Sequence, residues 1–373
     1  GLDGAAAGEI WGQLEGFAGF GFCKSHAAAF ALVAYQTLYL KAHYPAEFYC
    51  ALLNHQPLGF YPPEVIAGDA RRHGVPILRP DANRSQATCT LEPTCLPRQA
   101  SIRLGLRYVR GLGEAWQERI VQRRGDEPYR DLAGFCRRTR LPRAVVENLI
   151  RAGALDDLGS QQIVQMGEGS QEPPPSGLPT NSHWPEPKST SVRDHSEVAL
   201  GGPRRTQSNN RTRRDLLWAL GGLVYHEEGL DIEVPVAPVA LPALGRAERL
   251  AWEYELMGMA PGEHLMVLYR EALRAAGVLT SAQLAGRRNG ERVRVAGWAV
   301  VRQRPPTAKG HLFITLEDEE GLANLIVRPG VYDQYRDMLR NAPLLWIEGR
   351  LQREGHAISV LVYRAAALGG PEG

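Results

Sequence analysis

The chain has 373 residues, of which 44% are hydrophobic and 23% are charged, and its formal net charge at pH 7 is +2. A single hydrophobic core usually stops growing below this length, so we expect two or three domains. The near-neutral total excludes a strongly basic or acidic protein, and any preference for a charged partner must come from where the charges are placed.

The cysteines include no C-x-x-C pair, and their odd number indicates reduced thiols rather than a disulfide framework: Cys23, Cys50, Cys89, Cys95 and Cys136. No apolar run approaches the roughly 20 residues needed to cross a bilayer, and the first residues lack the basic start and apolar core of a signal peptide. We therefore expect a cytoplasmic protein without membrane contact. Because the chain starts at Gly1 and its first motif follows within a few turns, we also expect a fragment of a longer protein.

The first predicted helix runs from Ser25 to about His43, with apolar residues at helical spacing, Ser25 as N-cap and Pro45 as the stop. Two further helical patterns cover residues 48–53 and 65–70, on either side of a proline-rich break. Residues 1 to about 80 are therefore expected to form an all-helical unit.

A glycine-rich run, residues 16–23, precedes the first helix. Glycine lets the backbone approach a ligand closely, and Lys24, Ser25 and His26 would follow at a helix N-terminus, where free amides and the dipole favour an anion such as a triphosphate. The run is not a P-loop, because Gly21 is followed by Phe22. The alternative is a capped helix after a turn, with His26 merely packed.

A helical block is expected over residues 98–158, where thirteen arginines and no lysine outnumber the acids. A Gly-Leu-Gly sequence between two helical patterns suits a helix-hairpin-helix, because the glycines allow a tight turn that presents backbone amides to a phosphate. Nearby arginines would add attraction to the DNA backbone that is independent of sequence. The alternative is an ordinary turn. The candidate DNA contacts are Arg103, Arg107, Arg110, Gly111, Leu112 and Gly113.

Residues 160–212 contain prolines among Ser, Gly, Asn and Gln, with almost no periodic apolar residues. Such a composition cannot bury enough surface to offset the entropy lost on ordering, so we expect a disordered Pro/Ser-rich insertion.

We expect trypsin to cleave the native chain first between Gln161 and Arg211, because a segment without a packed core exposes its backbone to the protease. Limited proteolysis followed by mass spectrometry of the first fragments checks this. Resistance across the whole region would contradict it.

Helical patterns return at residues 213–223 and 247–257, which predicts a helical connector over 213–285. From residue 291 the apolar residues alternate with period two in five short segments, with a helical pattern near residues 332–340. This order predicts a small closed Greek-key barrel of the OB type over residues 286–373.

In the second of these strands, residues 312, 314 and 316 are expected to face inward and Phe313 outward. Phe313 could then stack on a base of a single-stranded template, beside Arg302, Arg304 and Lys309. The alternative is that Phe313 packs against the neighbouring helical domain.

Two acidic groups could in principle hold the metal ions of a nucleotide-transfer reaction: Asp156-Asp157, and the run from Glu317 to Glu320. Both are interpreted as solvated caps and turns, which favour such residues. We therefore assign no catalytic and no metal-binding residue.

The run GFGFCKSHAAAFAL at residues 19–32, continued through residues 35–37 and 40–48, resembles the late fingers region of C-family bacterial DNA polymerases of the DNA polymerase III alpha-subunit type. Residues 53–63 and 69–75 resemble the error-prone branch. In that family the fingers close over the incoming nucleotide, which implies a nucleotide-contact role for Lys24, Ser25 and His26. Phe20 and Cys23 depart mildly from the family pattern.

The resemblance implies a multidomain α+β chain with these parts: an all-helical late-fingers segment (1–97), a helix-hairpin-helix DNA-binding region (98–159), the insertion (160–212), the helical connector (213–285) and a five-stranded OB-type β-barrel (286–373). Family members continue almost directly from a sequence like Leu158-Gly159 into one like residues 213–220. The intervening residues are therefore either a tolerated loop or an error in the sequence.

The resemblance also implies an error-prone DNA-directed DNA polymerase acting in DNA repair and damage-induced mutagenesis. Its Mg²⁺ ions would be bound by palm aspartates outside this chain, so the chain alone should not polymerise. The implied partners are primer-template DNA and dNTP, with a sliding clamp and other mutagenesis proteins. One alternative is a freestanding DNA-binding scaffold; another, a nucleotide-handling enzyme centred on Lys24 and His26, leaves the later modules unexplained.

Overall fold

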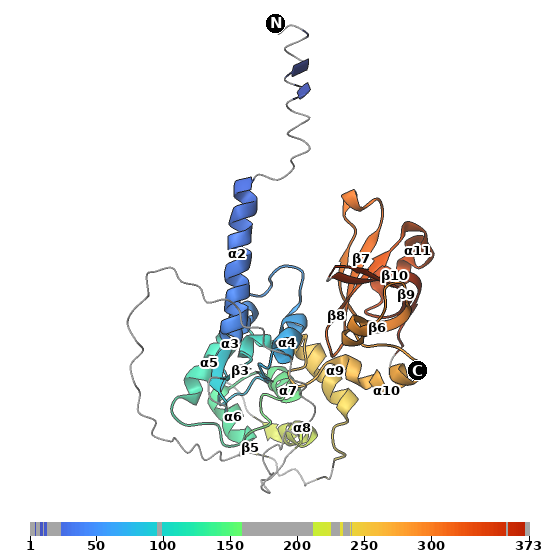
Figure 1. Cartoon of the computed structure of the whole chain (residues 1–373). Coiled ribbons are helices and arrows are strands. Elements are labelled where there is room, and N and C mark those ends of the chain that lie inside the picture. The colour runs from blue at the N-terminus through green and yellow to red at the C-terminus, as the bar shows by residue number, and fades with distance from the viewer. Residues whose placement is uncertain are drawn as a thin grey trace.

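A computed structural model describes residues 24–94, 99–158, 212–224, 241–355 and 357–369, with short pieces at 4, 8–9, 11–12, 232–233 and 239. The predicted insertion, up to residue 211, lies outside the described residues. The described chain forms a helical body and a β-barrel beside it, with α9 and α10 on the side of the body near the barrel (Figure 1).

The three predicted N-terminal helices are confirmed as α2 (Lys24–His43), α3 (Pro45–Asn54) and α4 (Pro63–Arg72). Both α3 and α4 begin with proline, whose fixed φ suits the first helical turn. Ser25 lies inside α2 rather than before it. Helix α2 extends away from the body (Figure 1), and its large apolar side chains, such as Phe30 and Leu38, are exposed.

A small three-stranded sheet lies where the sequence predicted only helix. It consists of β1 (Ile77–Leu78), β2 (Thr90–Pro93) and β3 (Ala100–Arg103) in the order β1-β3-β2. Strand β3 pairs with β1 in parallel and with β2 in antiparallel orientation. The expectation of a purely helical block from residue 98 was therefore wrong, and the predicted boundary at 97/98 falls between two paired strands.

The helix-hairpin-helix region follows as a 3₁₀ turn (Leu106–Tyr108), α5 (Glu114–Arg124), α6 (Leu132–Thr139) and α7 (Arg143–Arg151). Beyond the insertion come α8 (Arg213–Gly221), the short strands β4 (Leu223–Val224) and β5 (Ile232–Glu233), and α9 (Arg246–Met257). Thr212 and Asp215 form a capping box at the start of α8.

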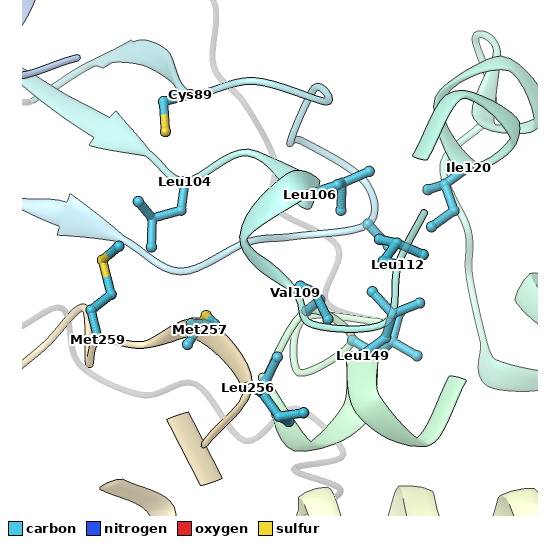
Figure 2. Packing of buried hydrophobic residues seen from close by; sticks show 14 of the residues in the cluster. Cys89, Leu104, Leu106, Val109, Leu112, Ile120, Leu149, Leu256, Met257 and Met259 are labelled. Carbon is cyan, nitrogen blue, oxygen red and sulfur yellow. The ribbon is translucent and has the colours of Figure 1, made fainter. Parts of the chain in front are cut away.

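One apolar core joins these elements although they are distant in sequence (Figure 2). Leu256, Met257 and Met259, from the end of α9 and just beyond it, pack in the same cluster as Leu106 and Leu149. The amide of Arg110 also donates to the carbonyl of Leu256 at 2.8 Å. The C-terminal end of helix α9 therefore packs against the hairpin and helps to fix its turn.

The connector ends in a 3₁₀ turn (Leu265–Leu268), α10 (Arg270–Ala275) and a second 3₁₀ turn (Ala282–Gly286), and the barrel follows. The barrel contains β6 (Arg292–Gln303), a 3₁₀ turn (Pro306–Ala308), β7 (Leu312–Glu317), β8 (Leu322–Val327), α11 (Pro329–Gln334), α12 (Arg336–Asn341), β9 (Leu344–Glu354) and β10 (Ala357–Ala367). The ring closes in the order β10-β8-β7-β6-β9, which confirms the predicted five-stranded barrel.

Strands β9 and β10 approach closely at Gly349. A Cβ atom at this position would lie 2.4 Å from the carbonyl oxygen of Leu361 and 2.6 Å from Val360 Cγ1. Only glycine fits such a contact without a shift of the backbone.

Candidate nucleic-acid interface and the joint between domains

The predicted hairpin turn is present at residues 110–113. Gly111 has a φ of +81°, a conformation that glycine adopts without steric cost. Leu112 points into the core, and its carbonyl accepts a hydrogen bond from Gln117 Nε2 at 2.7 Å. Gly113 is the N-cap of α5. The element before the turn is a 3₁₀ turn rather than the predicted α-helix. The amides of Trp116 and Gln117, in the first turn of α5, donate to the carbonyl of Gly113.

The arginines around the hairpin divide into two groups. Arg107 and Arg110 are exposed; Arg107 Nη1 donates to the carbonyl of Asn54 at 3.0 Å, and the Arg110 side chain has no partner among the described residues. Arg103, by contrast, is only 5% exposed and forms two hydrogen bonds with Glu92, at 2.9 and 3.0 Å. Of the three arginines predicted to contact DNA, Arg107 and Arg110 therefore lie at the surface. Arg103 is buried and bonded to Glu92, so it is not available to DNA.

Ser25 and His26 lie exposed at the end of α2 that is farthest from the helical body (Figure 1). The His26 ring packs edge-on against Phe30, with 4.4 Å between the ring centroids. The side chain of Lys24 lies outside the described residues. The structure does not bring this predicted nucleotide-binding group near the hairpin or the barrel.

The outer face of β7 has the alternation that the sequence predicts. Leu312, Ile314 and Leu316 are buried, whereas Phe313 is 37% exposed and faces outward. Lys309 is exposed on the loop before β7, and the exposed Arg304 guanidinium lies 4.5 Å from the ring centroid of Tyr332.

Arg302, on β6, is paired with the buried Ile314 rather than with Phe313, and it has a different environment. Its guanidinium donates to the carbonyls of Leu339 at 2.8 Å, Ala299 at 3.0 Å and Ala342, and burial lowers its pKa. Arg302 therefore fixes the segment after α12, and Arg304, Lys309 and Phe313 form the accessible part of the predicted single-strand face.

The interpretation of Asp156 as a solvated cap was wrong. Arg213 Nε donates to both of its carboxylate oxygens at 3.1 and 3.0 Å, and Arg213 Nη2 donates to Glu253 at 3.1 Å. Arg79 Nε lies 3.6 Å from Asp156. Burial raises the pKa of Asp156 and of Glu253, and Arg213 opposes both shifts. This buried cluster connects the two sides of the insertion.

Glu317 was also interpreted as a residue of a solvated turn, and its side chain is in fact fully buried. It ends β7 and enters the joint between the barrel and the helical body, where Arg72 Nη1 lies 3.5 Å and His264 Nε2 lies 3.8 Å from its oxygens. A Cβ atom at Gly68 of α4 would lie 2.8 Å from Glu317 Oε1. Neither carboxylate oxygen accepts a hydrogen bond from any described residue.

Burial in this joint strongly shifts the pKa values of two side chains. Burial, with a contribution from Glu64, raises the pKa of Glu317 to about 8. Burial, with contributions from Arg71 and Arg72, lowers the pKa of His264 to about 3. Sequence reasoning missed this site because its members come from α4, the connector and β7.

Within the described ranges, no group of three or more His, Cys, Asp or Glu side chains could hold a metal ion. In the same ranges, no helix is both long and apolar enough to span a membrane.

Two family models match the chain: a helix-hairpin-helix motif at residues 74–163 and an OB-fold nucleic acid binding domain at residues 293–365. An error-prone DNA polymerase of Anaeromyxobacter sp. (strain K) is 36% identical over 99% of this chain and 29% of its own length. An error-prone DNA polymerase of Symbiobacterium thermophilum is 35% identical over 99% of this chain and 34% of its own length. The chain thus spans about a third or less of these curated relatives.

Among solved structures, the asparaginyl-tRNA synthetase of Pyrococcus horikoshii matches 24% of this chain and 23% of its own, at 18% identity and a TM-score of 0.22.

Proposed function

Because the chain is similar over almost its whole length to the C-terminal part of error-prone DNA polymerases, we propose that it is the DNA-holding portion of such an enzyme. The full-length protein would be a DNA-directed DNA polymerase acting in repair and damage-induced mutagenesis. The observation that best supports this proposal is the hairpin turn at Gly111, where the N-terminus of α5 and the exposed side chains of Arg107 and Arg110 lie close together along the chain.

The hairpin would bind the phosphate backbone of the primer-template duplex. Amides at the start of α5 would donate to a phosphate oxygen, and Arg107 and Arg110 would add charge without reading the bases. On the barrel, Phe313 would stack on a base of the single-stranded template, with Arg304 and Lys309 near the strand's phosphates. Contacts of these two kinds hold DNA without regard to its sequence.

Nucleotide transfer would require carboxylates around Mg²⁺. The two acidic groups of this chain do not fit that task, because Asp156 is held by Arg213 and Glu317 is buried beside Arg72. The metal ions would therefore be bound by another part of the full-length enzyme, and this chain alone would not extend a primer. Contact of Lys24, Ser25 and His26 with the incoming dNTP, and binding of a sliding clamp or other mutagenesis proteins, are part of the same proposal.

Replacing Arg107 and Arg110 together with glutamate should weaken binding of the 373-residue chain to primer-template DNA of any sequence. Each lost phosphate contact lowers the slope of log affinity against log salt by about 0.9, so the double variant should lose about 1.8. Fluorescence anisotropy over a salt series measures both quantities.

Arg130 is exposed and lies outside the hairpin, so Arg130→Glu is the control for charge reversal at one exposed position, to be compared per substituted residue. An equal loss in the control, or a loss confined to one DNA sequence, would contradict phosphate binding by the hairpin. The freestanding scaffold remains the second candidate, and it is favoured if no polymerase coding sequence continues upstream of this chain. Extension of a primer by the purified chain would overturn both readings.

A further inference from the structure

A hollow of about 640 Å³ opens on the barrel between the connector and strands β6, β9 and β10. Five of the residues that line it are arginines: Arg274, Arg287, Arg292, Arg294 and Arg364. The carboxylates in its lining are Glu291 and Glu348. Guanidinium groups thus outnumber carboxylates in a concave, solvent-accessible site.

The strand register explains why these charges meet. Arg294 on β6 is paired with Glu348 on β9, and Glu348 is paired with Arg364 on β10. The Glu348 carboxylate lies 2.6 Å from Arg292 and 3.9 Å from Arg294, so its single negative charge is shared between two arginines. Arg292 also lies directly opposite Arg350, and like charges in opposite positions destabilise a sheet.

Two of the lining arginines form no ion pair with any described residue. Arg274, in the last turn of α10, and Arg364, on β10, are exposed, and their guanidinium groups have no acceptor among the described residues. Arg287, in contrast, is paired with Glu291 at 3.4 Å. Arg274 and Arg364 are therefore the groups most available to a ligand.

This hollow is separate from the single-strand face at Phe313. In the closed ring, β7 has β6 and β8 as neighbours, whereas β9 has β6 and β10. Glu348 and Arg364, from β9 and β10, thus lie on a side of the barrel that β7 does not adjoin. The nucleotides that contact Phe313 would therefore not be the ones that contact the hollow.

We propose that the hollow is a second binding site of the barrel, for phosphate groups. The forked donors of arginine match the oxygens of a phosphate and can bind it in bidentate fashion. The phosphates would come either from the backbone of a nucleic-acid strand, which rests on the proposed function, or from a free polyphosphate. The two sources share one chemistry and can be separated experimentally.

The test is a double variant, Arg274→Glu with Arg364→Glu, made in the 373-residue chain. Neither substitution removes a hydrogen bond or ion pair within the described residues. Arg340→Glu, at an exposed position of α12 outside the hollow, is the control for charge reversal, to be compared per substituted residue. One arm measures binding of a dT20 oligonucleotide over a salt series, and the other measures binding of inorganic pyrophosphate by calorimetry.

For a nucleic-acid strand, we expect affinity for dT20 to fall about tenfold in the double variant and the salt slope to fall by about 1.4, since each single-strand phosphate contributes about 0.7. The control should retain the wild-type slope.

Loss of pyrophosphate binding with unchanged dT20 binding would assign the site to a free polyphosphate instead. Equal behaviour of the double variant and the control with both probes would overturn the phosphate site. If the Arg107/Arg110 variant fails to affect DNA while this one succeeds, the hairpin role alone is wrong.

Discussion

Replacing Arg213 with alanine should lower the free energy of unfolding of the helical body by about 3–5 kcal/mol, the cost of breaking a buried ion pair by removing one partner. Arg213 is almost fully buried and donates to Asp156 and Glu253. Without it, Glu253 loses this donor and Asp156 keeps only Arg79, at 3.6 Å. Both carboxylates already have pKa values raised by burial, so unpaired charge there is costly. Urea denaturation followed by circular dichroism measures the loss.

Arg214→Ala is the matched control, because the neighbouring Arg214 pairs with Glu248 at a half-buried position, whereas Arg213 is almost fully buried. Ion pairs that keep contact with solvent contribute little to stability, so this variant should lose much less than Arg213→Ala. A comparable loss in both variants would show that the start of α8, rather than the buried ion pair, determines the result.

Replacing Glu317 with glutamine should stabilise the chain above pH 8 and have little effect near pH 5. The folded-state pKa of Glu317 is raised to about 8 from 4.5, so the folded state binds the proton more tightly than the unfolded state. Stability from this group is therefore fully present below pH 4.5 and is lost as the pH rises through 8. The loss amounts to roughly 1.4 kcal/mol per pH unit at most. Glutamine does not ionise, so the variant avoids this loss of stability.

His264 acts in the opposite direction. Its folded-state pKa is lowered to about 3 from 6.5, so its contribution to stability increases as the pH rises from 3 to 6.5. Because His264 is present in both proteins, its own titration cancels in the difference between wild type and Glu317→Gln, which leaves the carboxyl group and its contact with His264.

Urea midpoints between pH 5 and pH 9, followed by tryptophan fluorescence, would measure that difference. Glu354→Gln, at the exposed end of β9, should show no such pH dependence. A Glu317→Gln variant that is less stable than the wild type at pH 9 would mean that Arg72 stabilises the ionised carboxylate.

The barrel could be predicted from sequence because its strands alternate over six or more residues, as at Leu312–Glu317, and buried alternate positions leave a readable pattern. The strands β1 and β2 could not, because segments of two and four residues contain too little alternation to distinguish from a loop. Strand β1 also pairs with a partner 25 positions later along the chain. Such pairing is decided by tertiary contacts.

The candidate interface shows the same division. The turn at Gly111 was predictable because a positive φ requires a residue type that is visible in the sequence. The burial and the partner of each charged side chain could not be predicted. Arg103 and Glu317 look like surface residues in the sequence, yet their partners, Glu92 and Arg72, are fixed by packing between separate elements. Charge density predicted where DNA contacts are to be sought, but not which arginines are free to make them.

Each strand of the closed barrel has a hydrogen-bonded neighbour on both sides. A partner protein or peptide therefore finds no strand with a wholly free margin to which it could add its own backbone, a common route of assembly for open sheets. Whatever the barrel recognises must be recognised through outward side chains and loops. Exchanging those residues should retarget the barrel while leaving its framework in place.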